Sequence, residues 1–194
     1  MRNYISIIAS IFFLLSSCKR DTLDRTVFVP DPDDPNLPAY TEWGYNSFGA
    51  EYERAYFQSS TLTVPCKIVY QAGLLHFSLI GYLRNEGTKT ELTFSFPISA
   101  INVYQDLLIL HNTVIDLSDT VCEVQFKGDT LSPLQGSHLT FKRAQLLRVD
   151  GAENRVILSG TFDIDFRVNG RPEFISDGRF DMGINRDFAV ATDP

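Results

Sequence analysis

The chain has few of the residues that carry common enzyme and metal chemistry. Its 194 residues include three cysteines, three histidines and one tryptophan. The histidines, His76, His111 and His138, lie far apart, whereas zinc sites use His or Cys pairs at short, fixed spacings. No glycine-rich loop of the kind that cradles phosphates opens a helix. The sequence therefore predicts no bound metal and no cofactor.

Arrangements typical of catalysis are also missing. Gly136-Ser137-His138 lacks the second glycine of a nucleophile elbow, and Cys66 and Cys122 have the apolar neighbours of inert thiols. Asp163 and Asp165, two positions apart in an expected strand, resemble half of a glycosidase carboxylate pair or a cation site. A solvated strand face explains the same pattern more simply. We therefore predict that the protein is not an enzyme.

Basic residues and long hydrophobic runs are scarce as well. Lys and Arg together number 17 against 24 Asp and Glu, which gives a net charge of −7. An acidic chain without a basic stripe repels phosphate backbones, so nucleic acid is excluded as a partner. The longest apolar stretch, Ile5–Leu15, is shorter than the roughly 20 residues that cross a bilayer core. A retained membrane helix is therefore disfavoured.

The N-terminus reads as a signal peptide over residues 1–17. A basic start, Met1-Arg2-Asn3, precedes the apolar stretch, and small residues follow it. Leu15-Ser16-Ser17-Cys18 resembles the lipobox of bacterial lipoproteins. This resemblance implies cleavage before Cys18, a lipid on its thiol and a membrane anchor for the mature chain. The alternative is an ordinary secretory signal that happens to end near a cysteine.

Residues 18–40 are expected to form a linker. Asp31-Pro32-Asp33-Asp34-Pro35-Asn36-Leu37-Pro38 combines prolines with like charges, a composition typical of extended and unfolded spacers. The carboxylates also suit calcium, but prolines between acids disfavour the tight loop that wraps a cation. We predict a spacer here and a folded domain over residues 41–190.

From Glu42 onward the pattern is that of short strands. In Arg155–Val168 apolar residues alternate with polar ones, and Asn169-Gly170 then predicts a tight hairpin turn into Phe174–Ile184. A slip of the apolar phase between Phe141 and Leu146 predicts a β-bulge, and Asp177-Gly178 predicts a turn or bulge. Further strands are expected at Thr61–Tyr70, Leu74–Leu83, Glu91–Ile98, Leu107–Ile115, Val121–Lys127 and His138–Val149.

These strands predict an all-β domain. A short helix is expected at Ala50–Phe57 or near Ser99–Gln105. The regular spacing of strands and turns predicts an antiparallel meander that forms a barrel or a sandwich, of the lipocalin or calycin type. The pattern does not separate a packed sandwich from a hollow barrel.

The C-terminal hairpin carries a resemblance to a known group. Leu158-Ser159-Gly160-Thr161-Phe162-Asp163 and Ile175-Ser176-Asp177-Gly178-Arg179-Phe180-Asp181, together with the signal peptide, resemble small Bacteroidetes-type lipoproteins. The resemblance implies an all-β, calycin-like domain of unknown function, anchored in the outer membrane. Lys19-Arg20-Asp21 is similar to the charged signal that exports such proteins to the cell surface. Surface and periplasmic locations both stay open.

Cys66 and Cys122 offer one testable pairing. Each shares its strand parity with apolar neighbours, so both side chains are expected to point inward. The compartment that the signal peptide predicts is oxidising, which permits a disulfide between them. The alternative is two separate buried thiols that pack as small apolar groups.

Aromatic residues crowd the start of the domain. Exposed Trp and Tyr rings stack on sugars and anchor interfaces, so Trp43, Tyr45 and Tyr82 are candidates for a ligand platform. The alternative is that the early aromatics form the first strand and plug one end of the core.

Three functions follow from this sequence. The first is a non-catalytic lipoprotein that binds a glycan, lipid or other small ligand in a cleft or barrel mouth. The second is a structural or interaction subunit of an envelope complex, with a filled core and an exposed apolar patch or strand edge. The third is an enzyme, which the missing constellations disfavour.

Overall fold

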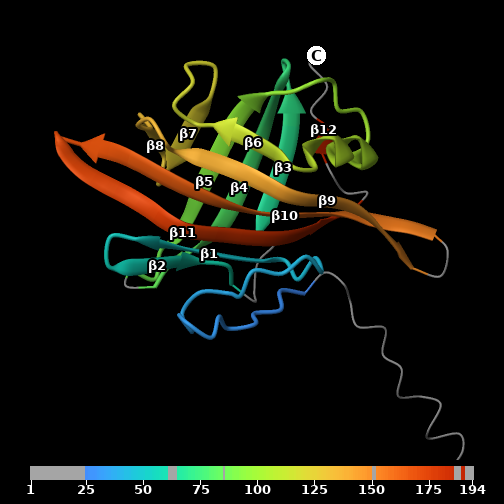
Figure 1. The fold of residues 1–194 in the computed structure, drawn as a ribbon, viewed down its shortest axis with the longest axis horizontal. Helices are drawn as coiled ribbons and strands as arrows, with labels where there is room; N and C mark the ends of the chain where they lie inside the picture. Colours follow the sequence, from blue (N-terminus) through green and yellow to red (C-terminus); the bar gives the residue numbers. More distant parts are fainter. Residues whose placement is uncertain (1–24, 61–64, 85, 150–151, 186–188, 191–194) are drawn as a thin grey trace, which may run out of the picture.

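The strands expected from alternating apolar residues are present and join in one strongly curled sheet, a half-barrel (Figure 1). The computed structural model describes residues 25–60, 65–84, 86–149, 152–185 and 189–190. The prediction of an antiparallel all-β fold of the barrel type is confirmed. The elements are β1 (Ser47–Tyr52), β2 (Ala55–Gln58), β3 (Cys66–Gln71), β4 (Leu74–Leu83), β5 (Lys89–Pro97), the 3₁₀-helix η1 (Tyr104–Leu110), β6 (Thr113–Asp116), β7 (Glu123–Phe126), β8 (Asp129–Leu131), β9 (His138–Val149), β10 (Ala152–Val168), β11 (Arg171–Ile184) and β12 (Ala189–Val190).

The strand order follows the chain except at a few places. It runs β6-β9-β10-β11-β1-β2-β4-β5-β7-β8, while β3 pairs with β4 and with β12. Among the described strands, β3 and β12 run parallel and the other pairs are antiparallel. The main departure from a meander is that β1 lies between β11 and β2. The first strand therefore pairs with the last long strand.

The irregularities predicted in the long strands are also found. The register between β9 and β10 shifts around Lys142, which is the bulge that the phase slip predicted. A second shift in β11 lies at Asp177, whose φ is 51°. Asn169 and Gly170, with φ of 51° and 81°, form the turn between β10 and β11. Both bulges bend the long strands and help to curl the sheet.

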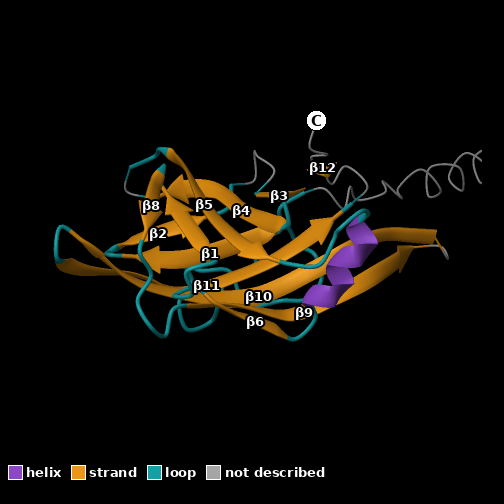
Figure 2. Ribbon diagram, turned by 90° about the horizontal axis from the view of Figure 1, so that it is seen from above, coloured by secondary structure: helices purple, strands orange, loops and turns teal. Residues whose placement is uncertain are grey.

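A short helix is present at one of the two expected places: η1 begins at Tyr104, within Ser99–Gln105, while Ala50–Phe57 forms the hairpin of β1 and β2. One strand prediction is wrong. Leu107–Ile115, expected as a strand, begins inside η1 and reaches a strand only at β6. The buried residues of η1 recur every third position, the period of a 3₁₀-helix, and η1 packs on β9 and β10 (Figure 2). Residues 61–64 of the expected strand Thr61–Tyr70 lie outside the described residues.

The inner face of the curled sheet is filled by phenylalanine rings. Neighbouring Phe rings have centroids 4.8 to 6.3 Å apart, the range of contacting aromatic pairs. The fully buried rings are Phe48, Phe57, Phe77, Phe94, Phe96, Phe141, Phe162, Phe166 and Phe180. Side chains therefore occupy the interior at these positions.

Part of the outer face of the same sheet, near β1 and β11, is covered by residues 25–46, here called the strap (blue to cyan in Figure 1). Leu37 is buried, and Pro38 and Leu37 lie where a Cβ on Gly49 of β1 would be. Backbone bonds fold the strap on itself, with the Ala39 N–H donating to the Val29 carbonyl (2.7 Å). The strap is thus an ordered layer on the sheet.

The prediction of an unfolded spacer is therefore wrong for the described part of residues 18–40. The Asp31 carboxylate accepts a hydrogen bond from the Asp33 N–H (2.9 Å) and also pairs with Arg179 of β11. Asp34 likewise accepts from the Asn36 N–H (3.0 Å). The acids that suggested a repelling chain instead close local turns. Residues 25–40 thus belong to the folded layer, while the expected signal peptide and Cys18 lie outside the described residues.

Candidate functional site

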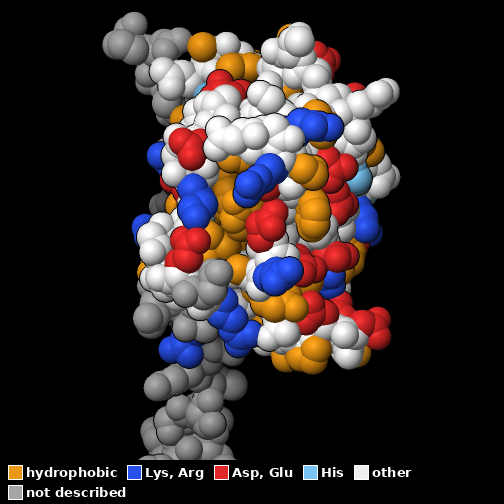
Figure 3. All heavy atoms as spheres, turned by 90° about the vertical axis from the view of Figure 1, so that its left-hand side faces the viewer, with side chains coloured by type: hydrophobic (Ala, Val, Ile, Leu, Met, Phe, Trp, Pro, Cys, Tyr) orange, Lys and Arg blue, Asp and Glu red, His pale blue; other side chains and the backbone are white. Residues whose placement is uncertain are grey.

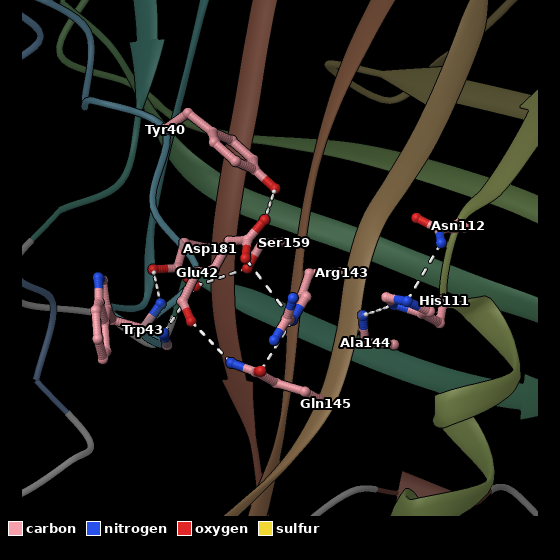
Figure 4. Close-up of polar contacts among 11 residues, drawn as sticks. Tyr40, Glu42, Trp43, His111, Asn112, Arg143, Ala144, Gln145, Ser159 and Asp181 are labelled. Atoms are coloured by element: carbon pink, nitrogen blue, oxygen red, sulfur yellow. Dashed lines mark hydrogen bonds and ion pairs between the residues drawn. The ribbon is translucent and has the colours of Figure 1, made fainter.

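A buried carboxylate holds the last part of the strap against the sheet. Asp181 lies on the outward side of β11 and is 2% exposed. Its Oδ1 accepts a hydrogen bond from the Gly44 N–H at 2.8 Å. Its Oδ2 accepts from the Thr41 hydroxyl (2.6 Å) and from the N–H groups of Trp43 (3.0 Å) and Tyr45 (3.2 Å) (Figure 4). One side chain therefore fixes the turn of residues 41–45.

A hydroxyl group and a glycine also help to hold the turn of residues 41–45 on the sheet. Ser159 on the neighbouring strand β10 donates to Asp181 Oδ1 at 3.0 Å. Gly44 has a φ of +74°, a conformation that favours glycine, and a Cβ there would meet Ile157 at 3.2 Å. The five donors leave the carboxylate well satisfied inside the protein. Asp181 therefore anchors the turn to the sheet.

Polar side chains form a cluster beside the turn. The Tyr40 hydroxyl donates to Glu42 Oε1 (2.9 Å), and Arg143 Nε lies 3.7 Å from Glu42 Oε2. Gln145 Nε2 donates to the Glu42 carbonyl (3.0 Å), and its Oε1 accepts from Arg143 (2.9 Å). Lys142, the bulge residue of β9, lies 4.9 Å from the centre of the Tyr40 ring. Burial, followed by the Glu42 hydrogen bond, raises the pKa of Tyr40.

Trp43 is the most exposed large apolar side chain among the described residues. It is 69% exposed, although its own N–H is fixed by Asp181. In Figure 4 the indole points away from Arg143 and Gln145 and from the strands that carry them. A large ring is thus presented to the surroundings on a rigid backbone.

The structure does not assemble the predicted ligand platform of Trp43, Tyr45 and Tyr82. Tyr45 neighbours Trp43 but is half-buried. Tyr82 lies on β4, opposite Gln58 of β2, and is also half-buried. In the sheet order β1 and β2 stand between β4 and the Asp181 strand. Of the three, only Trp43 is an exposed aromatic surface.

The disulfide between Cys66 and Cys122 is not formed, and both residues are free thiols that pack against the core. Across the sheet, the row of paired residues that starts at Cys66 of β3 continues through β4 and β5 and ends at Phe126 of β7. Three strand spacings amount to about 14 Å across the sheet, and Cys122 lies four residues before Phe126. A disulfide needs Cα atoms within about 7 Å. Burial raises the pKa of both thiols, as expected for inert cysteines.

The remaining candidates stay apart. His76 Nδ1 lies 2.8 Å from the Ser95 hydroxyl on β5. His111 follows η1 and accepts a hydrogen bond from the Ala144 N–H (3.2 Å), so its predicted place in a strand is wrong. His138 Nε2 lies 3.7 Å from Asp163. Within the part of the chain that the structure describes, no group of three or more His, Cys, Asp or Glu residues could hold a metal ion.

Asp163 and Asp165, the candidate carboxylate pair on β10, form hydrogen bonds to neighbouring segments. Asp163 Oδ1 accepts from the Asp177 N–H at the β11 bulge (3.1 Å), and burial raises the pKa of Asp163 above its ordinary value. Asp165 bonds through its backbone N–H to the Ser137 hydroxyl (3.0 Å). Both residues therefore fasten the loop and bulge beside them.

Sequence reasoning missed Asp181. It stands between Phe180 and Met182 on the outward parity of its strand, where a solvated acid is the usual occupant. Its strap partners lie 136 to 140 residues earlier in the chain. No local pattern signals such a contact.

In comparisons with known proteins, no family model, curated protein or solved structure matches this chain. The fold therefore defines it as an all-β half-barrel domain, and the resemblance to Bacteroidetes-type lipoproteins stays a prediction. No helix among the described residues is long and apolar enough to cross a membrane.

Proposed function

We propose that this protein is a non-catalytic interaction subunit of a cell-envelope assembly. In this proposal a lipid on Cys18 anchors it to the membrane, and the tip of the β10–β11 hairpin contacts a partner protein. The projecting tip is the observation that carries the proposal.

The tip extends beyond the strands on either side. The β9 ladder reaches β10 only as far as the pair His138–Asp163, and the β1 ladder ends at the pair Tyr52–Ile175. Residues 165–168 and 171–174 pair in the sheet only with one another. In Figure 1 this two-stranded ribbon projects at the left of the molecule. A projecting ribbon can enter a groove that a flat sheet face cannot.

The tip carries the side chains that protein interfaces favour. Phe174 is 46% exposed and Val168 is 38% exposed. Arg167 and Arg171 flank them in a chain that is acidic overall. Figure 3 views this end of the molecule, where apolar side chains lie among charged ones of both signs. Aromatic and Arg side chains are enriched in interfaces, so the tip suits an apolar pocket with an acidic rim.

The filled interior favours this proposal over the first hypothesis from the sequence. A glycan, lipid or other small ligand inside the half-barrel would need space that the Phe rings occupy. The platform of three aromatics that would bind a sugar outside is reduced to Trp43.

The test is purification of the full-length protein from its own envelope under gentle conditions, followed by native mass spectrometry. We expect the wild-type protein to appear as a defined heteromer. Phe174→Ala should bind the same partner about tenfold more weakly, because a single hot-spot ring supplies about 1.4 kcal/mol or more. Val114→Ala is the matched control, since Val114 is 64% exposed on the distant strand β6. A bare wild-type monomer, or equal partner binding by both variants, would contradict the proposal.

A further inference from the structure

Three exposed apolar side chains lie on the strap, whose first described residue is Arg25. Val27 and Val29, at the start of the strap, are 44% and 38% exposed, and Trp43 is 69% exposed. The Val27 N–H donates to the Tyr45 carbonyl at 2.8 Å, which lays the start of the strap beside the turn that carries Trp43. The three side chains therefore lie on adjoining segments of one layer.

The position of the predicted anchor limits where this layer can go. The described chain begins at Arg25, seven positions after Cys18. Seven extended residues span at most about 24 Å. A lipid on Cys18 would therefore hold the start of the strap within that distance of the bilayer surface. Because the strap is fixed to the sheet, the domain cannot move farther away on a long spacer.

The chemistry of the layer suits a lipid surface. Tryptophan concentrates at membrane–water interfaces, where its ring is apolar and its N–H remains hydrated. Residues 19–25 contain three basic and two acidic side chains, in contrast to the acidic chain as a whole. The Asp181 bonds fix the turn in advance, so little backbone freedom is lost when the indole inserts.

We infer that Val27, Val29 and Trp43 form a membrane-facing surface that rests in the headgroup region of the bilayer holding the lipid anchor. This inference rests on the anchoring of Cys18 in the proposed function. It gives the domain a fixed orientation, with the strap turned toward the membrane.

The test uses the fact that Trp43 is the only tryptophan of the chain. Lipidated full-length protein is placed in phosphatidylcholine vesicles, with and without phosphatidylglycerol, and the fluorescence of Trp43 is recorded. We expect a blue-shifted emission that brominated lipid quenches at least twofold more than aqueous iodide does. Val27→Ser combined with Val29→Ser should reduce the quenching by lipid, and Val114→Ser should leave it unchanged.

Intact mass separates the two possible failures. If the mass shows the lipid on Cys18 but iodide quenches Trp43 as freely as in Cys18→Ser protein, the membrane-facing surface is wrong and the anchor stands. Protection of the indole by a co-purified glycan or a second copy, instead of by the bilayer, would also overturn the inference. A native chain without lipid on Cys18 would overturn the anchoring and the inference together.

Discussion

The two faces of the β10–β11 region are covered in different ways. On the inner face, Phe162 and Phe180 belong to a cluster of rings in which each contacts others. On the outer face, the strap touches the sheet through a few specific contacts. They include the Asp181 hydrogen bonds, the Asp31–Arg179 ion pair, the packing of Leu37 near Gly49 and the contacts of Glu42 with β9.

This difference predicts two kinds of response to mutation. Loss of one ring weakens the whole fold, because the cavity it leaves is shared by many neighbours. Loss of one strap contact should release the strap locally, while the half-barrel keeps its core. Four variants or conditions test this distinction.

The largest effect is expected for Phe141→Ala. The Phe141 ring is fully buried and contacts the rings of Phe77, Phe96 and Phe180 at centroid distances of 5.5, 5.9 and 5.5 Å. We expect a loss of about 3–5 kcal/mol in the free energy of unfolding, measured by urea denaturation. Phe141→Leu is the control and should lose much less. A loss below 1 kcal/mol for the alanine variant would show that the inner face is loosely packed.

Asp181→Asn should have the next largest effect. An amide has one acceptor oxygen in place of two, so several buried N–H and hydroxyl donors lose their partner. We expect a cost on the order of 3 kcal/mol, together with faster proteolysis of residues 25–46 and a changed Trp43 emission. Asp177→Asn, an exposed acid on the same strand, serves as the control. If the strap stayed protected from protease in Asp181→Asn, the carboxylate would not be its anchor.

Gly49→Ala should have a moderate and correctable effect. A Cβ at this position would collide with Pro38 and crowd Leu37, so the strap must shift. We expect a cost of about 1–3 kcal/mol, read from thermal unfolding. The same substitution in a Pro38→Ala background should cost less, since the nearest colliding atom is gone. Equal costs in the two backgrounds would place the collision elsewhere.

The smallest effect is expected from lowering the pH. Hydrogen bonds from backbone N–H groups, the largest from Asp33, and the charge of Arg179 lower the pKa of Asp31 below its ordinary 3.8. An acid whose pKa is lowered in the folded state stabilises the fold at pH values above its pKa in the unfolded state. This contribution disappears as the pH falls through the pKa of the folded state. Protease sensitivity of the strap should therefore rise below about pH 4.

Asp31→Asn is the matched variant for the acid experiment. It should remove part of this pH dependence and leave the strap more sensitive at neutral pH. Asp163, whose pKa is raised by burial, contributes in the opposite direction. An identical pH profile for wild type and Asp31→Asn would assign the acid response to other groups.

Periodicity predicted the inner face well because that face is built from local alternation. The bounds of β4 and β9 agree with the expected strands, and the bulge at Lys142 was visible as a slip of phase. Short apolar runs were less informative. Leu107 and Leu110 suit a strand or a 3₁₀ turn equally well until their contact with β9 and β10 decides.

The outer face could not be predicted in the same way. From composition alone, Asp31 and Asp34 were predicted to lie in an unfolded spacer, because charge and proline content carry no information on which surface lies nearby. Leu37 and Gly49 complement each other in shape, but neither shows this in its own neighbourhood. The position of the Trp43 backbone likewise depends on its hydrogen bond to Asp181, which lies near the other end of the chain.

The pairing of β1 with β11 has a consequence for the order of folding. Ser47 pairs with Asp181, so the first strand of the chain waits for the last long strand before its ladder can close. Contacts of such long sequence separation make folding slow. During synthesis β1 can pair with β2 as soon as that hairpin has emerged, but its other edge has no partner until β11 follows. The strap, which is held by Asp181 of β11, can therefore dock on the sheet only late in folding.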